Sequence, residues 1–190
     1  MSTQERVVGA GRSLIMSRGY NGFSYADVSE AVGIRKASIH HYFPTKADLA
    51  GAVLAQNSAG VREQAEAMAR EGVDPVSQLR LYAAYWERCI TEGAEPFCVA
   101  GMLATELPTL PAELAQAVRG HFQALSAWLT GVLEQGAALG RLRLAGSAAQ
   151  EAESFMSLVY GAMLTTRALG TPQMFKTIVE GALDRLIVAH

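Results

Sequence analysis

The side chains best suited to binding chemistry lie within residues 35–42, where cations and hydrogen-bonding groups follow one another over two predicted helical turns. Arginine and lysine pair with phosphates and with the acceptor atoms of guanine, serine bonds to bases or phosphates, and the alanine methyl group suits the methyl group of thymine. This pattern indicates a surface that reads double-stranded DNA. The side chains expected to project outward are Arg35, Lys36, Ala37, Ser38, His40 and His41.

Two short helices joined by a tight turn would position that surface. Ser24 followed by Asp27 is a capping-box-like helix start, and Gly33 stands where the first helix must stop in a left-handed conformation. The buried side of both helices consists of apolar residues at helical spacing: Val28, Ala31, Val32, Ile34 and Ile39. This spacing predicts a helix-turn-helix over residues 24–43, whose second helix enters the DNA major groove. An ordinary two-helix hairpin with a polar face is the competing interpretation.

Val7 and three short motifs follow one another in a fixed order: Arg18-Gly19-Tyr20, Gly33-Ile34-Arg35-Lys36-Ala37-Ser38-Ile39 and Tyr42-Phe43-Pro44-Thr45-Lys46-Ala47-Asp48-Leu49. In this order and spacing, residues 7–54 resemble the N-terminal domain of the TetR/AcrR family of bacterial repressors. The resemblance covers roughly a quarter of the chain. It implies a three-helix helix-turn-helix DNA-binding domain over residues 1–50 and a larger helical effector-binding and dimerisation domain over residues 51–190.

The resemblance also extends the expected DNA-binding set. His40, Tyr42 and Lys46 take family positions that mostly contact the DNA backbone, and such contacts position a protein without specifying a sequence. The residues that depart from the family's usual Ser, Gly, Tyr and His are Arg35, Ala37, His40 and Tyr42. Because of these departures, the operator sequence does not carry over. The complete expected set is Ser24, Arg35, Lys36, Ala37, Ser38, His40, His41, Tyr42 and Lys46, with a merely solvated side chain as the competing interpretation of Lys46.

Charge is distributed unevenly along the chain. The 190 residues carry a net charge of −2, but residues 1–50 hold six Lys and Arg against four Asp and Glu, while residues 51–190 hold ten against fourteen. The basic part coincides with the predicted helix-turn-helix, and affinity for phosphates follows local rather than total charge. The asymmetry therefore supports a nucleic-acid partner.

Hydrophobic periodicity predicts helices throughout, so we expect an all-α fold of about nine helices. Thr45 with Asp48 begins a fourth helix, which at 1.5 Å per residue would be about 35–40 Å long. Pro75 suits the first turn of the next helix, and Gly93 with Pro96 breaks the chain. Beyond residues 24–43, the expected helices span about 3–18, 45–70, 75–92, 98–106, the stretch after 108–111 to 139, 147–169 and 172–188, the last two capped by Ser147 and Thr171.

The last two predicted helices are apolar on more than one face, and such helices need two packing partners. One partner is the chain's own core. We expect the other to be a second copy of the chain, since the resemblance implies a four-helix dimer interface; complete burial within one subunit is the alternative. The expected interface residues are Phe155, Met156, Val159, Met163, Phe175, Ile178, Ala182 and Leu186.

Large apolar side chains on the middle helices would wall a ligand pocket, which is the regulatory device that the resemblance implies. No strong charge cluster lies among them, which favours a mostly apolar small-molecule effector. Ordinary core packing is the competing interpretation. The expected effector-binding residues are Tyr82, Trp86, Cys98, Met102, Phe122 and Leu125.

The two cysteines, Cys89 and Cys98, are too few for a disulfide scaffold and lack the spacing of a metal site. We expect Cys98 at a partly exposed helix start, a placement in which thiols become reactive. Some members of the resembled family with a cysteine at a comparable point sense electrophiles or oxidants. A redox sensor acting through Cys98 is therefore an alternative function, beside the simpler interpretation of an inert buried cysteine.

Signatures of catalysis are missing from the sequence, which has no GxSxG elbow, HExxH motif, Walker loop or GxGxxG followed by a strand. His40 and His41 are adjacent, so on a helix they point about 100° apart and do not easily share a metal. We therefore expect no enzyme, metal site or cofactor. No run approaches the roughly 18 apolar residues of a membrane span and no signal peptide opens the chain, so we expect a cytoplasmic protein with no membrane partner.

Together these features predict a homodimeric transcriptional regulator that binds a palindromic DNA operator and, as a repressor, is released by a small-molecule effector. In the resembled family, the effector tilts the long fourth helix and changes the separation of the two recognition helices. The alternatives are the sensor that acts through Cys98 and a helical interaction module that binds no DNA.

Overall fold

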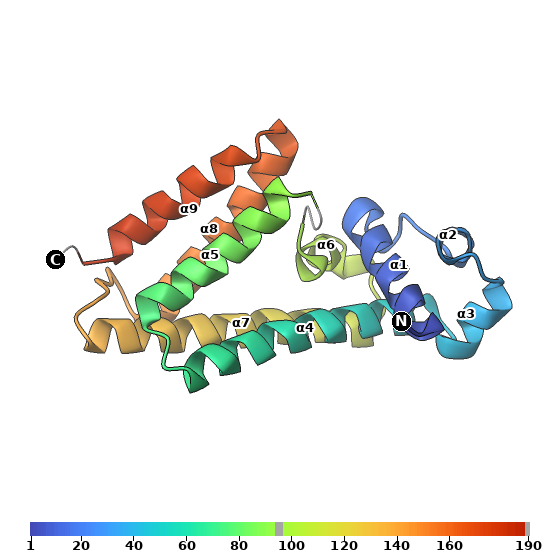
Figure 1. The fold of residues 1–190 in the computed structure, drawn as a ribbon, viewed down its shortest axis with the longest axis horizontal. Helices are drawn as coiled ribbons and strands as arrows, with labels where there is room; N and C mark the ends of the chain where they lie inside the picture. Colours follow the sequence, from blue (N-terminus) through green and yellow to red (C-terminus); the bar gives the residue numbers. More distant parts are fainter. Residues whose placement is uncertain (94–96, 189–190) are drawn as a thin grey trace. The chain divides into compact units, whose positions relative to one another are not determined.

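The computed structural model describes residues 1–93 and 97–188, and the regular structure in these ranges is helical (Figure 1). The elements are α1 (Thr3–Arg18), α2 (Tyr25–Val32), α3 (Lys36–Tyr42), α4 (Lys46–Arg70), α5 (Pro75–Thr91), α6 (Val99–Thr105), the 3₁₀ turn η1 (Leu107–Thr109), α7 (Ala112–Ala138), α8 (Ala148–Leu169) and α9 (Gln173–Leu186). The expected all-α class is confirmed. Pro96 lies outside the described residues, and no helix within the described ranges is both long and apolar enough to cross a membrane.

Three of the four predicted caps, at Ser24, Thr45 and Ser147, stand at the start of a helix. Thr45 and Asp48 bond to each other's backbone amides at the start of α4, and Ser147 caps α8. At α9 the prediction is wrong, because Pro172 rather than Thr171 is the N-cap. Pro172 already has helical dihedral angles, with φ −53° and ψ −36°, and the hydroxyl of Thr171 donates to a carbonyl of the preceding turn.

The chain packs into two compact units that alternate along the sequence. The first unit holds residues 1–62 and 98–122, and the second holds residues 63–97 and 123–190. Helices α4 and α7 each contribute to both units. The expected boundary after residue 50 remains a prediction about the division of function. Packing divides the chain elsewhere, since residues 98–122 belong with the N-terminal helices.

In the first unit, α1, α2 and α3 pack around the start of α4. Ile15 of α1, Val28 of α2 and Ile39 of α3 are fully buried, and a side chain of this size contributes about 1.5–3 kcal/mol when it leaves water. Gly11 of α1 lets α4 approach closely, because a β-carbon there would lie 3.2 Å from the side chain of Leu49.

Helix α6, η1 and the first turns of α7 complete the first unit, where α1 packs against α6. The hydroxyl of Ser58 in α4 hydrogen-bonds to Nδ1 of His121 in α7 at 2.8 Å. His121 is buried, and burial lowers the pKa of its imidazole below the ordinary value. The neutral ring is therefore the form that the first unit accommodates.

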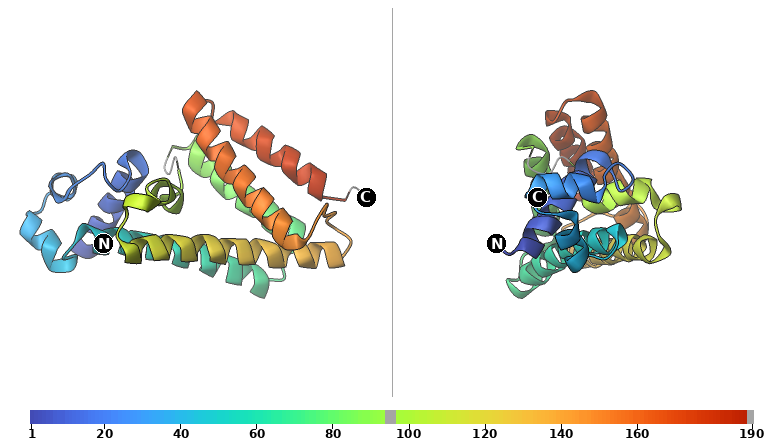
Figure 2. Two further views of the ribbon diagram at one scale, coloured as in Figure 1. Left: turned by 180° about the vertical axis from the view of Figure 1, so that it is seen from behind. Right: turned by 90° about the vertical axis from the view of Figure 1, so that its right-hand side faces the viewer.

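Helices α5, α8 and α9, with the later turns of α4 and α7, form the second unit (Figure 2). Helix α9 packs against both α8 and α5, and Leu79, Val159 and Phe175 are buried in the core. The backbone amide of Arg143 donates to the carbonyl of Leu186 at 2.7 Å, beside an isolated antiparallel bridge. These bonds tie the loop between α7 and α8 to the end of α9.

Six of the eight residues expected at a dimer interface belong to this core, and their contact with a second copy remains a prediction. The six are Phe155, Val159, Met163, Phe175, Ala182 and Leu186, which are buried within a single chain. Met156 and Ile178 are half-buried. Periodicity reveals that a helix has two apolar faces, but it does not reveal which face the helix's own chain covers. In α8 the uncovered face carries Gly161 and Leu164.

We expect acidification to destabilise the first unit through His121. Because its pKa is lower in the folded than in the unfolded state, the unfolded chain binds the proton first. Stability is therefore complete above about pH 6.5 and is lost as the pH falls towards the folded-state pKa, by at most about 1.4 kcal/mol per pH unit. His121→Gln should reduce the loss of unfolding free energy between about pH 7 and 5, measured by urea denaturation.

The matched control for this prediction is His41→Gln, because His41 is exposed. This variant should keep the wild-type pH dependence. An unchanged pH dependence in His121→Gln would contradict the assignment.

Candidate nucleic-acid interface

A capping box fixes the start of α2, as the spacing of Ser24 and Asp27 predicts. Asp27 accepts hydrogen bonds from the backbone amide and the hydroxyl of Ser24, both at 2.8 Å, and Arg18 donates to the same carboxylate at 2.7 Å. The bonds from Ser24, with a smaller effect of Arg18, lower the pKa of Asp27 to about 2. The carboxylate therefore stays ionised near neutral pH and keeps the cap in place.

The turn between α2 and α3 is held by one glycine and two side-chain bonds. Gly33 adopts a left-handed conformation with φ 73° and ψ 34°, which confirms the predicted helix stop. Ser29 donates its hydroxyl to the carbonyl of Ile34 at 2.6 Å, and Arg6 donates to the carbonyl of Val32 at 2.5 Å. The guanidinium of Arg6 also complements the negative end of the α2 dipole. These contacts fix the direction in which α3 leaves the turn.

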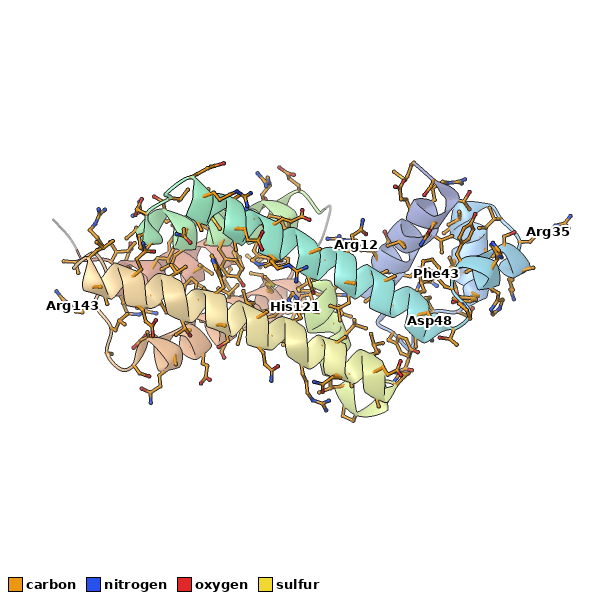
Figure 3. All side chains as sticks on the ribbon, turned by 90° about the horizontal axis from the view of Figure 1, so that it is seen from below. Arg12, Arg35, Phe43, Asp48, His121 and Arg143 are labelled. Atoms are coloured by element: carbon orange, nitrogen blue, oxygen red, sulfur yellow. The ribbon has the colours of Figure 1, made fainter. Side chains whose placement is uncertain are left out.

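Helix α3 has one buried anchor and a polar surface. Ile39 is fully buried, while the other residues of α3 and its N-cap Arg35 are exposed. Figure 3 shows Arg35 projecting away from the ribbon. The structure thus brings together most of the expected DNA-binding set, namely Arg35, Lys36, Ala37, Ser38, His40, His41 and Tyr42. Ser24 is also exposed, but it stands at the start of α2 and its hydroxyl serves the capping box.

His40 is oriented by groups on either side of it. Its Nδ1 lies 3.1 Å from the carbonyl oxygen of Pro44, and because a carbonyl only accepts, Nδ1 carries the proton. The ring packs edge-on against Tyr25, with centroids 4.7 Å apart. The hydroxyl of Tyr25 in turn donates towards the carbonyls of Phe43 and Thr45, at 2.8 and 2.6 Å. Burial, with smaller effects of Asp48 and Tyr20, raises the pKa of Tyr25 to about 12, so it remains a donor.

Lys46 makes contacts within the chain that the sequence analysis does not predict. Its ammonium group donates to the carbonyls of Tyr20 and Phe23, at 2.9 and 3.0 Å. It also lies over both rings, 4.4 Å from the centroid of Tyr20 and 5.1 Å from that of Phe23. Lys46 therefore fastens the start of α4 to the loop before α2. A DNA contact by this residue remains a prediction.

The sequence-based set lacks the side chains that hold this surface in place, chiefly Arg6, Arg18 and Tyr25. Their partners lie 26, 9 and 18 residues away along the chain. No helical spacing rule connects residues at such separations. Arg18 stands in the Arg18-Gly19-Tyr20 motif, which marks the resemblance without revealing its contact with Asp27.

The expected effector-binding residues are divided between the two units. Tyr82, Trp86 and Leu125 belong to the second unit, and Cys98, Met102 and Phe122 belong to the first. In the second unit, the ring of Tyr82 lies 5.7 Å from that of Trp128 and 6.4 Å from that of Phe155, between centroids.

Cys98 differs from the expectation of a partly exposed thiol. It is the N-cap of α6, yet only 1% of its surface is exposed, because it is packed into the first unit. Cys89 is also buried, and no disulfide joins the two cysteines. Position at a helix start therefore did not determine exposure.

Two family profiles match this chain. Residues 7–53 match the profile described as "Bacterial regulatory proteins, tetR family", and residues 75–182 match "Tetracyclin repressor-like, C-terminal domain". The first match contains the whole α2–turn–α3 surface. The second covers more than half of the chain.

Individual proteins show the same similarity. The HTH-type transcriptional regulator CymR of Pseudomonas putida is 39% identical over 49 residues, which span 26% of this chain and only 24% of CymR. A solved TetR-family transcriptional regulator from Agrobacterium tumefaciens is 45% identical, with a TM-score of 0.94 and 98% of each chain covered. A TetR transcriptional regulator from Legionella pneumophila is 25% identical, with a TM-score of 0.86 and the same coverage.

We expect Lys46→Met to lower the unfolding free energy by roughly 2 kcal/mol, because it removes two hydrogen bonds from a charged donor and two ring contacts. Chemical denaturation of the full chain measures this loss. Lys36→Met is the matched control, since Lys36 is exposed and should change stability little. Equal stability of the two variants would show that Lys46 has no structural role.

Proposed function

The chain belongs to the TetR family of bacterial regulatory proteins, and we propose that it is a transcriptional repressor that leaves a palindromic operator when a small molecule binds. Regulation of transcription through DNA binding is the function of the family. Repression and release by an effector are the specific form proposed for this chain, as a binding protein rather than an enzyme. The observation that carries the proposal is the exposed surface of α3, anchored by Ile39 and led by two adjacent cations, Arg35 and Lys36.

A two-fold symmetric operator follows if two copies of the chain bind together. Each copy would insert one α3 into the major groove, with half-sites about 34–36 Å apart or a multiple of that distance. Arg35 and Lys36 lie at the N-terminal end of α3, from which side chains reach base edges and phosphates. Two basic units would also double the phosphate contacts, which dominate affinity. Binding to the bacterial chromosome would place the protein in the cytoplasm.

The face of α8 opposite its core supports a homodimer. Leu164 is 57% exposed, Met156 and Tyr160 are half-buried, and the three recur at a spacing of four residues. Gly161 is exposed, and a β-carbon at this position would have no atom within 4 Å. When a second copy covers a stripe of this kind, the dimer gains about 25 cal/mol of stability for each Å² of apolar surface that leaves water. We propose this face, continued by Ile178 of α9, in place of the buried residues first expected there.

An effector site in the second unit would lie around Tyr82. The rings of Trp128 and Phe155 lie close to it, and Trp86 and Leu125 are buried in the same unit. Aromatic and aliphatic walls of this kind suit a mostly apolar effector. Contacts of Cys98, Met102 and Phe122 with an effector remain predictions. A sensor that acts through Cys98 has less support, because a buried thiol is poorly accessible to oxidants.

We expect Arg35→Ala to reduce affinity for the operator by about 1–3 kcal/mol while affecting random DNA less, because arginine reads guanine edges. Lys36→Ala should weaken binding to both DNAs and reduce the slope of log affinity against log salt by about 1. Fluorescence anisotropy with DNA flanking the protein's own gene, at several salt concentrations, measures both effects.

Arg80→Ala is the control for both variants, since Arg80 is an exposed cation of the second unit. It should bind as wild type does. If wild type binds the flanking DNA and random DNA with equal affinity at every salt concentration, binding to an operator in the flanking DNA is refuted. Failure to bind either DNA at low salt would refute DNA binding altogether and favour an interaction module.

We expect Leu164→Glu to convert dimers into monomers, because a charge on the apolar α8 stripe would have to be buried against a second copy. Operator affinity should fall at least tenfold, since one half-site loses the benefit of its linked partner. Light scattering after size-exclusion chromatography measures the mass. Leu81→Glu, which alters an exposed leucine of α5, should remain dimeric; a dimeric Leu164→Glu would exclude this face.

A further inference from the structure

The loop between α1 and α2, defined here as residues 19–23, is held from two directions. Lys46 at the start of α4 donates to the carbonyls of Tyr20 and Phe23. The α6–η1 segment, residues 99–109, holds Asn21, which lies next to Tyr20 in the loop. The proposed DNA contacts use none of these bonds, although the loop leads directly into the N-cap of α2.

Two glycines give the loop a backbone course that other residues would not readily adopt. Gly19 has φ 74° and ψ 177°, a combination that is essentially restricted to glycine. A β-carbon at Gly22 would lie 2.1 Å from the carbonyl oxygen of Arg18, well inside the contact distance of real atoms. The loop therefore has a defined shape, and the Arg18-Gly19-Tyr20 motif contributes part of it.

Glu106 reaches this loop from the end of α6. Its Oε2 accepts the backbone amide of Asn21 at 3.1 Å. Its other carboxylate oxygen, Oε1, would lie 2.4 Å from a β-carbon at Gly19, so it occupies space that any side chain there would need. The absence of a side chain at Gly19 thus allows the carboxylate to approach the loop.

Thr109 makes the second bond. The side-chain amide of Asn21 donates to the hydroxyl oxygen of Thr109 at 2.9 Å, and that hydroxyl donates to the carbonyl of Glu106 at 2.9 Å. Backbone and side chain of Asn21 are therefore both engaged by a segment 85 to 88 residues further along the chain. Two directional bonds to one loop residue define its orientation as well as its position.

From this geometry we infer that Glu106 and Thr109 are positioning residues for operator binding, acting through Asn21 on the helix-turn-helix; the inference rests on the proposed function. The loop ends one residue before Ser24, whose capping box with Asp27 begins α2, and α2 leads through a fixed turn to α3. Arg18, immediately before the loop, bonds to the same Asp27. A change in the orientation of the loop therefore reaches the helix that faces DNA without passing through α4.

The experiment compares Glu106→Ala and Thr109→Val in the full chain. Hydrogen–deuterium exchange of the free protein should show about tenfold faster exchange confined to residues 19–27, because local opening of the loop and the α2 start becomes easier. Operator affinity should fall about fivefold for each variant, the effect of one ordinary hydrogen bond, while affinity for random DNA changes less than twofold. A loss of folded protein would lower both affinities equally, so the ratio separates positioning from stability.

Matched controls come from the same unit. Thr105 is exposed on α6 and, like Thr109, bonds back to a carbonyl three residues earlier, but no hydrogen bond joins its side chain to the loop in the described residues. Thr105→Val should therefore leave exchange and operator affinity unchanged. Glu113→Ala, at an exposed carboxylate in the first turn of α7, controls for loss of charge. Glu106→Gln keeps an oxygen that can accept from Asn21 and should restore most of the operator affinity.

The two kinds of measurement fail separately. If exchange at residues 19–27 in Glu106→Ala and Thr109→Val matches that of Thr105→Val, the positioning role is refuted, whatever the DNA data show. If exchange rises but the ratio of operator to random affinity stays at the wild-type value, the contact is structural and the inference is also refuted. Absence of operator binding by wild type refutes the proposed function and, with it, a positioning role in operator binding, while exchange still reports whether the contact holds the loop.

Discussion

The burial of Ile39 is the interaction on which the DNA-facing surface depends. Helix α3 has seven residues, far fewer than the roughly 12–15 that an isolated helix needs to be even marginally stable in water. Its exposed side chains gain no packing of their own, so tertiary contacts must hold the helix together. Ile39 supplies the apolar anchor, and the aromatic contact of His40 with Tyr25 supplies a second one. The polar side chains of α3 can remain exposed because Ile39 and the contact of His40 with Tyr25 hold the helix in place.

That support consists mainly of polar side chains that bond to backbone groups of another element. Arg6 caps the end of α2, Tyr25 joins α2 to the segment between α3 and α4, and Lys46 joins α4 to the loop before α2. Each bond contributes only about 0.5–3 kcal/mol, with the charged donors at the upper end. Their combined effect is orientation, since each is directional and together they link all four helices. A surface arranged before DNA arrives loses less conformational entropy on binding.

The sequence was sufficient for the helices and for the exposed residues of α3, because both follow from local rules. Caps such as Ser24 with Asp27, the stop at Gly33 and the periodicity of α4 depend on residues a few positions apart. The burial of Cys98 and of Phe155 was beyond such rules, since it depends on which elements pack together. Two apolar stripes on α8 are equivalent in the sequence, and only the fold distinguishes the one that faces α9. The hydrogen bonds of Lys46 could not be predicted from the sequence for the same reason.

The interleaving of the two units bears on how a signal would reach DNA. The family profiles match residues 7–53 and 75–182 as separate stretches, whereas residues 98–122 of the second stretch pack with the first. A movement of α6 would therefore act inside the unit that carries α3, through Glu106 and Thr109, and need not be transmitted along the length of a connecting helix. Helix α4, through Lys46, and the α6–η1 segment, through Glu106, both hold the loop of residues 19–23 by hydrogen bonds to neighbouring backbone groups. We expect a regulator built in this way to respond to displacement of either element, because Lys46 of α4 and Glu106 at the end of α6 both hold the loop that leads into α2.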